Sequence, residues 1–169
     1  MKNTVLLLFI FLISSFAVAE QTTEKEAVKE TAPVPGSLSS PHATMATFIH
    51  AMNDIKRGKV EKIEDAVSTL DLESINPLVR AEQGENLAWL LLEVMDRTRI
   101  VDLERIPNRK EGSSWIFGEY DSGVIRIARY PDGRWLFDNE SVTDLNEIWD
   151  EVAGKEKIKG LENSDEHLP

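Results

Sequence analysis

The alternation of apolar and polar positions predicts three short β-strands in the second half of the chain, each rich in β-branched and aromatic side chains. The predicted strands cover residues 114–120, 124–130 and 134–138. Between the last two, Pro131-Asp132-Gly133 indicates a three-residue hairpin loop, because proline sets the first φ angle and glycine accepts a left-handed position. Such a loop fixes the register of the hairpin. It predicts the pairs Tyr130 with Arg134, Arg129 with Trp135 and Ile127 with Phe137.

This register gathers apolar side chains on one face of the predicted sheet. The face consists of Ile125, Ile127, Trp135 and Phe137, which Trp115 and Phe117 can join from the first strand. Arg129 could lie over the Trp135 ring, a contact worth roughly 0.5–1 kcal/mol where it is exposed. The alternative is a solvated arginine beside a tryptophan of the core. In either case we expect this face to pack against the rest of the domain.

Apolar residues that recur at three- and four-residue spacing predict four helices around the strands. The predicted helices cover approximately residues 41–57, 60–70, 78–98 and 142–153. Ser40 and Pro41 begin the first helix as a capping hydroxyl and a first-turn proline. Ser141 is predicted to cap the last helix, with Asp144 in the capping-box position.

The third predicted helix contains Gly84, which weakens a helix by ~1 kcal/mol relative to alanine and which the pattern does not explain. Its buried face is expected to carry Leu87, Leu90, Leu91, Val94 and Met95, with Trp89 near one margin. After this helix, residues 100–103 predict a short extended segment. A polar loop over residues 109–113 then leads into the first strand.

The order of these elements predicts an α+β domain over residues 40–153. Three N-terminal helices pack on a small antiparallel sheet of three or four strands, and a C-terminal helix closes the domain. Because helices and strands are segregated along the chain, we expect the helices to lie on one face of the sheet. Outside residues 1–19, every aromatic side chain lies between Phe48 and Trp149, and this concentration sets the limits of the domain.

The segments that flank the domain predict export. Residues 1–19 have the pattern of a secretory signal peptide, with Lys2, an apolar run and a small-residue cleavage site between Ala19 and Glu20. An uncleaved anchor is the alternative, but the apolar run is shorter than the ~20 residues that span a membrane. Residues 20–39 predict a disordered linker, and residues 154–169 a flexible acidic tail. We therefore expect a periplasmic protein with no transmembrane segment in the mature chain.

The charge of the chain argues against a nucleic-acid partner. The formal net charge is −11, and removal of Lys2 with the signal peptide would leave −12. Such a surface repels nucleic acid and anionic lipid headgroups. The chain contains no cysteine, so no disulfide can form even in an oxidising compartment.

No catalytic or metal-binding motif appears in the sequence. The three histidines, His42, His50 and His167, show no metal-ligand spacing, and neither a GxSxG elbow nor a glycine-rich phosphate loop is present. His50 and Asp54 are one helical turn apart, which indicates a surface pair rather than a metal site, since metal sites need three or four convergent ligands. We expect no cofactor and no enzymatic activity.

One cluster of residues suggests a binding surface. Arg126, Arg129 and Arg134 lie close together on the predicted hairpin of an acidic chain, beside Trp135. These four residues are the candidate partner-binding surface. The alternative is structural, since the arginines could pair across strands with Glu119, Asp121 or Asp138 at ~0.2–1 kcal/mol for each pair.

Four segments resemble a known family in their order along the chain. They are SPHATMATFIHAMN, LDLESI, LAWLLLEVMDRTRIVDLERIP and GVIRIARYPDGRWLFDNESV. Together they resemble an extracytoplasmic domain that precedes the membrane region of some bacterial MscS-type mechanosensitive channel proteins, although Ser141-Val142 stands where threonine-valine is usual. The resemblance covers roughly residues 40–152 and implies a non-catalytic periplasmic module whose partner is an envelope or membrane protein, such as a mechanosensitive channel.

The resemblance does not extend to the helices of a channel, so it does not imply pore activity. We expect either a free-standing version of the domain or the leading part of a split channel gene. A second hypothesis is a ligand-binding or enzymatic domain of the cone-shaped α+β type related to nuclear transport factors, which also uses strands ending in DGxW, here Asp132 to Trp135. This second hypothesis requires a deep apolar cavity lined by histidine or aspartate.

Overall fold

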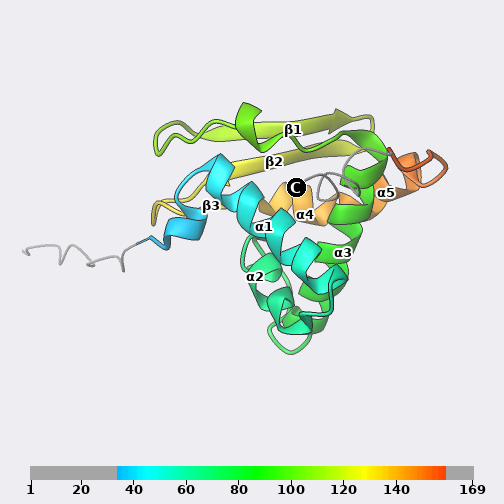
Figure 1. The fold of residues 1–169 in the computed structure, drawn as a ribbon, viewed down its shortest axis with the longest axis horizontal. Helices are drawn as coiled ribbons and strands as arrows, with labels where there is room; N and C mark the ends of the chain where they lie inside the picture. The colour runs from blue at the N-terminus through cyan, green and yellow to red at the C-terminus, as the bar shows by residue number, and fades with distance from the viewer. Residues whose placement is uncertain (1–33, 159–169) are drawn as a thin grey trace, which may run out of the picture. The chain divides into compact units, whose positions relative to one another are not determined.

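The structure is a computed structural model that describes residues 34–158 (Figure 1). Its helices and strands are η1 Gly36–Leu38, α1 Pro41–Lys56, η2 Val60–Lys62, α2 Ile63–Val67, α3 Arg80–Thr98, η3 Leu103–Arg105, β1 Ser114–Tyr120, β2 Gly123–Arg129, β3 Trp135–Phe137, α4 Asn139–Thr143 and α5 Leu145–Val152. The three strands form one antiparallel sheet in the order β1-β2-β3. The predicted α+β class, with its closing C-terminal helix, is confirmed. The predicted signal peptide and the cleavage site at Ala19 and Glu20 lie outside the described residues.

The hairpin of β2 and β3 has the register that the turn sequence predicts. Arg129 pairs with Trp135 and Ile127 with Phe137, and the Tyr130 amide donates to the Arg134 carbonyl at 2.8 Å. Gly133 has a φ of 89°, a left-handed value that side chains disfavour. The chemistry of the turn therefore determines how this half of the sheet is paired.

Strand β1 is irregular in a way that the sequence did not indicate. Ile116 pairs with Arg126 and Gly118 with Ile125, so Phe117 is an extra residue that forms a β-bulge. The bulge keeps the Phe117 ring on the inner face of the sheet. That face is apolar as predicted, and its buried members are Phe117, Ile125, Ile127, Trp135 and Phe137, each at most 2% exposed.

The helices lie on one side of the β1–β2 hairpin (Figure 1), and α1 begins where the sequence predicts. The Ser40 hydroxyl accepts a hydrogen bond from the Ala43 amide at 3.0 Å, and Pro41 is the first helical residue. Further along α1, Phe48 packs edge-on against Phe137, with 5.5 Å between the ring centroids. This contact joins the first helix to the last strand.

The second predicted helix is shorter than expected, because residues 69–71 run beside β3 instead. The Phe137 amide donates to the Thr69 carbonyl at 2.9 Å, and the Asp71 amide donates to the Phe137 carbonyl at 2.8 Å. Leu70 thereby forms an isolated parallel bridge with Phe137. The segment predicted as extended, residues 100–103, forms no strand, and the 3-10 helix η3 begins at Leu103.

Helix α3 begins at Arg80 rather than at Leu78, whose side chain is 92% exposed. Its structure explains the glycine that the sequence left unexplained. A Cβ atom on Gly84 would lie 2.7 Å from Leu72 Cδ1 and 2.9 Å from Val67 Cγ1. Gly84 therefore allows α3 to approach α2 and the following loop more closely than alanine would allow.

The prediction that Ser141 caps the last helix is wrong. Asp138 is the N-cap, and its carboxylate accepts a hydrogen bond from the Ser141 amide at 3.0 Å. The Ser141 hydroxyl donates to Asp138 Oδ1 at 2.6 Å and accepts from the Arg126 amide at 2.8 Å. Because β3 ends at Phe137, this buried hydroxyl satisfies a strand amide that has no facing strand. The helix is also divided at Asp144 into α4 and α5.

The domain is longer at both ends than the sequence predicts. Residues 36–38, assigned to the linker, form η1 and bury Leu38. At the other end, the Ile158 amide donates to the Asp96 carbonyl of α3 at 2.7 Å, within the segment predicted as a flexible tail. Among residues 34–158, no helix is both long enough and apolar enough to cross a membrane.

We predict that Gly84→Ala destabilises the domain although alanine is the better helix former. The gain in helix propensity is about 1 kcal/mol, whereas overpacking against Leu72 and Val67 costs roughly 1–3 kcal/mol. Urea denaturation should show that the free energy of unfolding of the variant is lower than that of the wild type by about 1 kcal/mol. Gly154→Ala is the control, because nothing lies within 4 Å of a Cβ there. A Gly84→Ala variant more stable than the wild type would contradict the close packing.

Candidate functional site

Two of the three arginines of the predicted binding surface, Arg126 and Arg134, form ion pairs within the fold. Arg126 Nε contacts Asp138 Oδ2 at 2.5 Å, and its Nη2 contacts Glu140 Oε2 at 2.5 Å. Hydrogen bonds to Asp138 and then to Glu140 raise the pKa of the Arg126 guanidinium. The pairing neutralises Arg126, so this side chain holds β2 against the start of α4 instead of presenting a free charge.

The other members of that surface do not form a site with Arg126. Arg134 pairs with Asp132 inside the turn, with 2.6 Å between Nε and Oδ2. Trp135 has no exposed surface, as expected for a member of the packed face, so its indole does not form part of an accessible binding surface. Arg129 is exposed at the end of β2, and the cation-π contacts of the described residues are Arg97 with Trp149 and Arg99 with Phe117.

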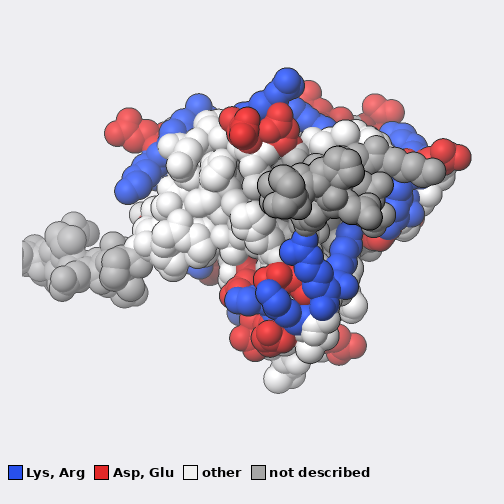
Figure 2. All heavy atoms as spheres, viewed as in Figure 1, with Lys and Arg blue, Asp and Glu red and all other residues white. Residues whose placement is uncertain are grey.

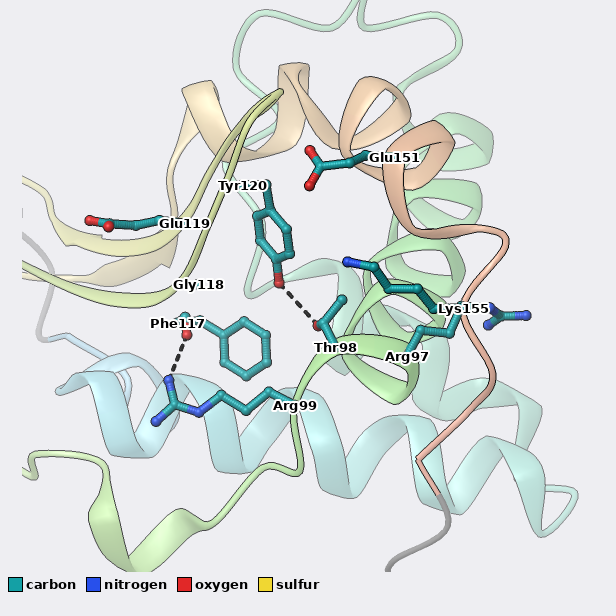
Figure 3. Close-up of a pocket in the computed structure, with 9 residues that line it drawn as sticks. All are labelled: Arg97, Thr98, Arg99, Phe117, Gly118, Glu119, Tyr120, Glu151 and Lys155. Carbon is teal, nitrogen blue, oxygen red and sulfur yellow. Dashed lines mark hydrogen bonds between the residues drawn. The ribbon is translucent and has the colours of Figure 1, made fainter.

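An open pocket of about 320 Å³ lies elsewhere, where the C-terminal end of α3 meets β1 and the end of α5 (Figure 3). Its lining combines cations, carboxylates and aromatic rings. The lining residues are Arg97, Thr98, Arg99, Phe117, Gly118, Glu119, Tyr120, Glu151 and Lys155. Three cations and two carboxylates are among these residues. This pocket is the candidate functional site.

Tyr120 and Thr98 join β1 to α3 inside the pocket. The Thr98 hydroxyl donates to the Val94 carbonyl at 2.8 Å, so the hydrogen in its 3.0 Å contact with Tyr120 comes from the tyrosine. Burial raises the pKa of Tyr120, which keeps the phenol neutral. Its oxygen retains lone pairs that can accept a further hydrogen bond. Gly118 leaves room for this arrangement, since a Cβ there would lie 2.7 Å from the Tyr120 hydroxyl oxygen.

The two arginines of the lining differ in orientation. Arg99 Nη1 donates to the Phe117 carbonyl at 2.8 Å, and the guanidinium carbon lies 5.8 Å from the Phe117 ring centroid. Arg97 extends away from Tyr120 in Figure 3, toward Trp149 at 4.7 Å and into an ion pair with Glu93. Of the two, only Arg99 reaches the Phe117 side of the pocket.

Lys155 supplies the remaining cation, and the chain that follows it is anchored to α3. In Figure 3 its amine points into the pocket, toward Tyr120. Two residues later, Lys157 Nζ contacts Glu93 Oε1 at 2.6 Å, and the Ile158 amide bonds the Asp96 carbonyl. These contacts fix the course of the segment that carries Lys155.

Sequence reasoning missed this pocket because its residues come from three separate segments, at 97–99, 117–120 and 151–155. The only local indication of the pocket was the group of basic residues at the end of the third predicted helix. Basic residues at a helix C-terminus also interact favourably with the helix dipole, so they did not by themselves indicate a binding site. The sequence contained no information that a bulge would direct both Phe117 and Tyr120 toward that helix end.

Neither of the two hollows found among the described residues has the lining that the ligand-binding hypothesis requires. The pocket is lined by neither histidine nor aspartate, and a second hollow, between Leu70, Leu91 and Phe137, holds only about 10 Å³. Within residues 34–158, no group of three histidine, aspartate or glutamate side chains could hold a metal ion. His50 is exposed, and Asp54 pairs with Lys59 at 3.0 Å.

Comparison with known proteins found no matching family model, no matching curated protein and no matching solved structure. The resemblance to the extracytoplasmic domain of mechanosensitive channel proteins therefore stays a prediction. The site is defined by its own geometry alone.

We predict that the anchor of the C-terminal segment weakens in acid. Burial raises the pKa of Glu93, but hydrogen bonds from Lys157 and Arg97 outweigh this effect and hold the pKa below its ordinary value. A carboxyl group whose pKa is lowered by folding stabilises the fold above its unfolded pKa, and this stabilisation is lost as the pH falls through the folded pKa.

Lys157→Gln should therefore lower the free energy of unfolding at pH 6 by about 0.5 kcal/mol, the usual contribution of an exposed ion pair. Near pH 3 the variant and the wild type should be equally stable. Urea denaturation at both pH values measures the difference. Lys155→Gln is the matched control, because Lys155 forms no ion pair among the described residues. Equal stabilities of wild type and Lys157→Gln at pH 6 would show that the pair does not anchor the segment.

Proposed function

We propose that this protein is a non-enzymatic periplasmic interaction module that docks on an envelope or membrane protein, with a mechanosensitive channel as the partner that the sequence resemblance suggests. The observation that carries the proposal is an exposed isoleucine, Ile116, on the outer face of β1. The periplasmic location rests on the signal-peptide pattern of residues 1–19.

On β1 and β2 the outer face consists of the side chains that alternate with the buried ones, namely Ser114, Ile116, Glu119, Val124, Arg126 and Ala128. On β3 the same face carries Leu136, which pairs with Ala128 and is buried. The helices lie on the opposite side of the β1–β2 hairpin (Figure 1). Ile116 is 42% exposed, while Val124 and Ala128 are half-buried beside it. Burial of these apolar side chains by a partner would be favourable at about 25 cal/mol per Å².

The free edge of β1 is less suited to docking than this face. Arg99 donates to the Phe117 carbonyl at 2.8 Å, and Arg109 Nη2 donates to the Ser114 carbonyl at 3.2 Å. The bulge at Phe117 further disturbs the edge. Arginine side chains and bulges on an edge strand hinder the addition of another strand. We therefore place the partner on the outer face of the sheet.

The surface charges agree with a protein partner better than with nucleic acid. Figure 2 shows side chains of both signs interspersed over α2 and the adjoining ends of α1 and α3. On the outer face, Arg126 is neutralised by Asp138 and Glu140, and Glu119 is exposed. A continuous basic stripe, which phosphate binding requires, is not visible in this view.

The test is affinity capture from envelope extract of the source cells, with the captured protein identified by mass spectrometry. We predict that the wild-type chain captures a defined membrane protein and that Ile116→Lys lowers the yield at least fivefold, because a charge replaces an apolar contact. Leu78→Lys is the matched control, since Leu78 is also exposed but lies in the loop before α3.

Both variants should unfold within about 0.5 kcal/mol of the wild type, as exposed substitutions usually do. Capture that is equally strong with Ile116→Lys would move the docking site away from the outer face. Failure of all three chains to capture any membrane protein, together with turnover of a metabolite by the purified protein, would overturn the proposed function.

A further inference from the structure

We infer that the pocket between the end of α3, β1 and the end of α5 binds a carboxylate group attached to an apolar or aromatic body (Figure 3). The carboxylate would belong either to a small organic acid or to the C-terminal residue of a peptide. This inference does not depend on the docking function, because the two cations that would hold the carboxylate, Arg99 and Lys155, do not belong to the outer face of the sheet.

Arg99 is the first group that would hold the carboxylate. Its guanidinium has five N–H donors in a planar fork that fits a carboxylate. One nitrogen, Nη1, bonds the Phe117 carbonyl at 2.8 Å, and no other hydrogen bond engages this side chain among the described residues. The bond to Phe117 fixes the position of the guanidinium and leaves donors available for a ligand.

Lys155 is the second group. Its amine points into the pocket in Figure 3 and has no ion pair within residues 34–158. A flexible lysine normally loses side-chain entropy when it binds. The Lys155 side chain bears that cost, but the anchoring of Lys157 and Ile158 on α3 already restricts the conformation of the backbone that carries it. A ligand therefore meets a cation whose backbone is already held in place.

The Tyr120 ring provides the apolar contact of the pocket, because the Phe117 ring is only 2% exposed. Phe117 and Tyr120 both face the pocket from β1, on either side of Gly118 (Figure 3). Tyr120 is neutral because burial raises its pKa, so it does not repel an anion. Because its hydrogen is given to Thr98, its oxygen can accept a hydrogen bond from a peptide N–H or a water molecule.

The carboxylates of the lining do not compete for the two cations. Glu119 points away from Tyr120 and Arg99 in Figure 3. Glu151 accepts hydrogen bonds from the amide and the hydroxyl of Ser122, both at 3.0 Å. These bonds hold the Glu151 carboxylate at the turn between β1 and β2. Two cations and one engaged carboxylate favour a ligand with a single negative charge. The volume of about 320 Å³ lies at the lower end of the range of small-molecule sites.

The test is a titration of the ¹⁵N-labelled protein, followed by amide chemical shifts. The probes are 3-phenylpropionate, the uncharged 3-phenylpropanamide, and a tetrapeptide ending in phenylalanine with either a free or an amidated C-terminus. We expect the carboxylates to give saturable shifts at Arg99, Gly118 and Tyr120. The amides should bind at least tenfold more weakly, because they lack the charge that Arg99 and Lys155 recognise.

Lys155→Gln and Arg99→Gln should each weaken carboxylate binding at least fivefold. Lys155→Gln is the decisive variant because the Lys155 side chain forms no hydrogen bond or ion pair among the described residues, whereas Arg99→Gln also removes the bond to Phe117. Lys110→Gln removes an equal charge from the exposed loop before β1 and should bind like the wild type. Tighter binding of the free peptide than of 3-phenylpropionate would assign the site to a peptide terminus, and equal binding would assign it to a small acid.

Two results would overturn the inference. One is the absence of saturable shifts at the pocket with every carboxylate probe, and the other is wild-type affinity in Lys155→Gln. Neither result bears on the docking function, since its test uses Ile116 and Leu78, which do not line the pocket. The two proposals can therefore fail separately.

Discussion

The arrangement of helices and sheet depends on Phe137, which lies in a short strand, and on the hydrogen bonds that its backbone amide and carbonyl form. Strand β3 has only three residues, and β2 pairs with one edge of it. On the other edge, the Phe137 amide and carbonyl bond Thr69 and Asp71 of the loop after α2. The Phe137 ring packs on Phe48 of α1. A buried backbone group without such a partner would cost about 1–3 kcal/mol, so these contacts hold the helices on one face of the sheet.

The same constraint shapes the two surfaces that we assign to binding. With the helices confined to one face, Ile116 on the other face of β1 is exposed. On the inner side, the bulge in β1 directs Phe117 and Tyr120 toward the end of α3, where Thr98 and Arg99 bond them. The pocket is therefore a consequence of how β1 is paired and does not require a dedicated loop.

Local chemistry made part of this structure predictable. The turn Pro131-Asp132-Gly133 determined the register of β2 and β3, and Ser40 with Pro41 determined the start of α1, because each effect involves neighbouring residues. Ser141 could not be interpreted in this way. A serine three residues before an aspartate has the sequence of a capping box, yet Asp138 caps the helix and the Ser141 hydroxyl completes the edge of β2.

Other features required contacts between distant segments. Gly84 is explained only by the positions of Leu72 and Val67. The arginines of the hairpin were predicted as a cluster, but nearby carboxylates engage Arg126 and Arg134. The pocket combines three segments that no periodicity connects. Sequence patterns describe the elements, whereas sites depend on how the elements meet.

Native-state hydrogen exchange tests the junction at β3 most directly. Three amides depend on groups outside regular strand pairing: Phe137 on the Thr69 carbonyl, Asp71 on the Phe137 carbonyl and Arg126 on the Ser141 hydroxyl. We expect all three to exchange as slowly as the amide of Ile127 in the centre of the sheet, through global unfolding. Exchange of Phe137 and Asp71 at the rate of exposed loop amides would contradict the proposed junction and the placement of the helices that follows from it.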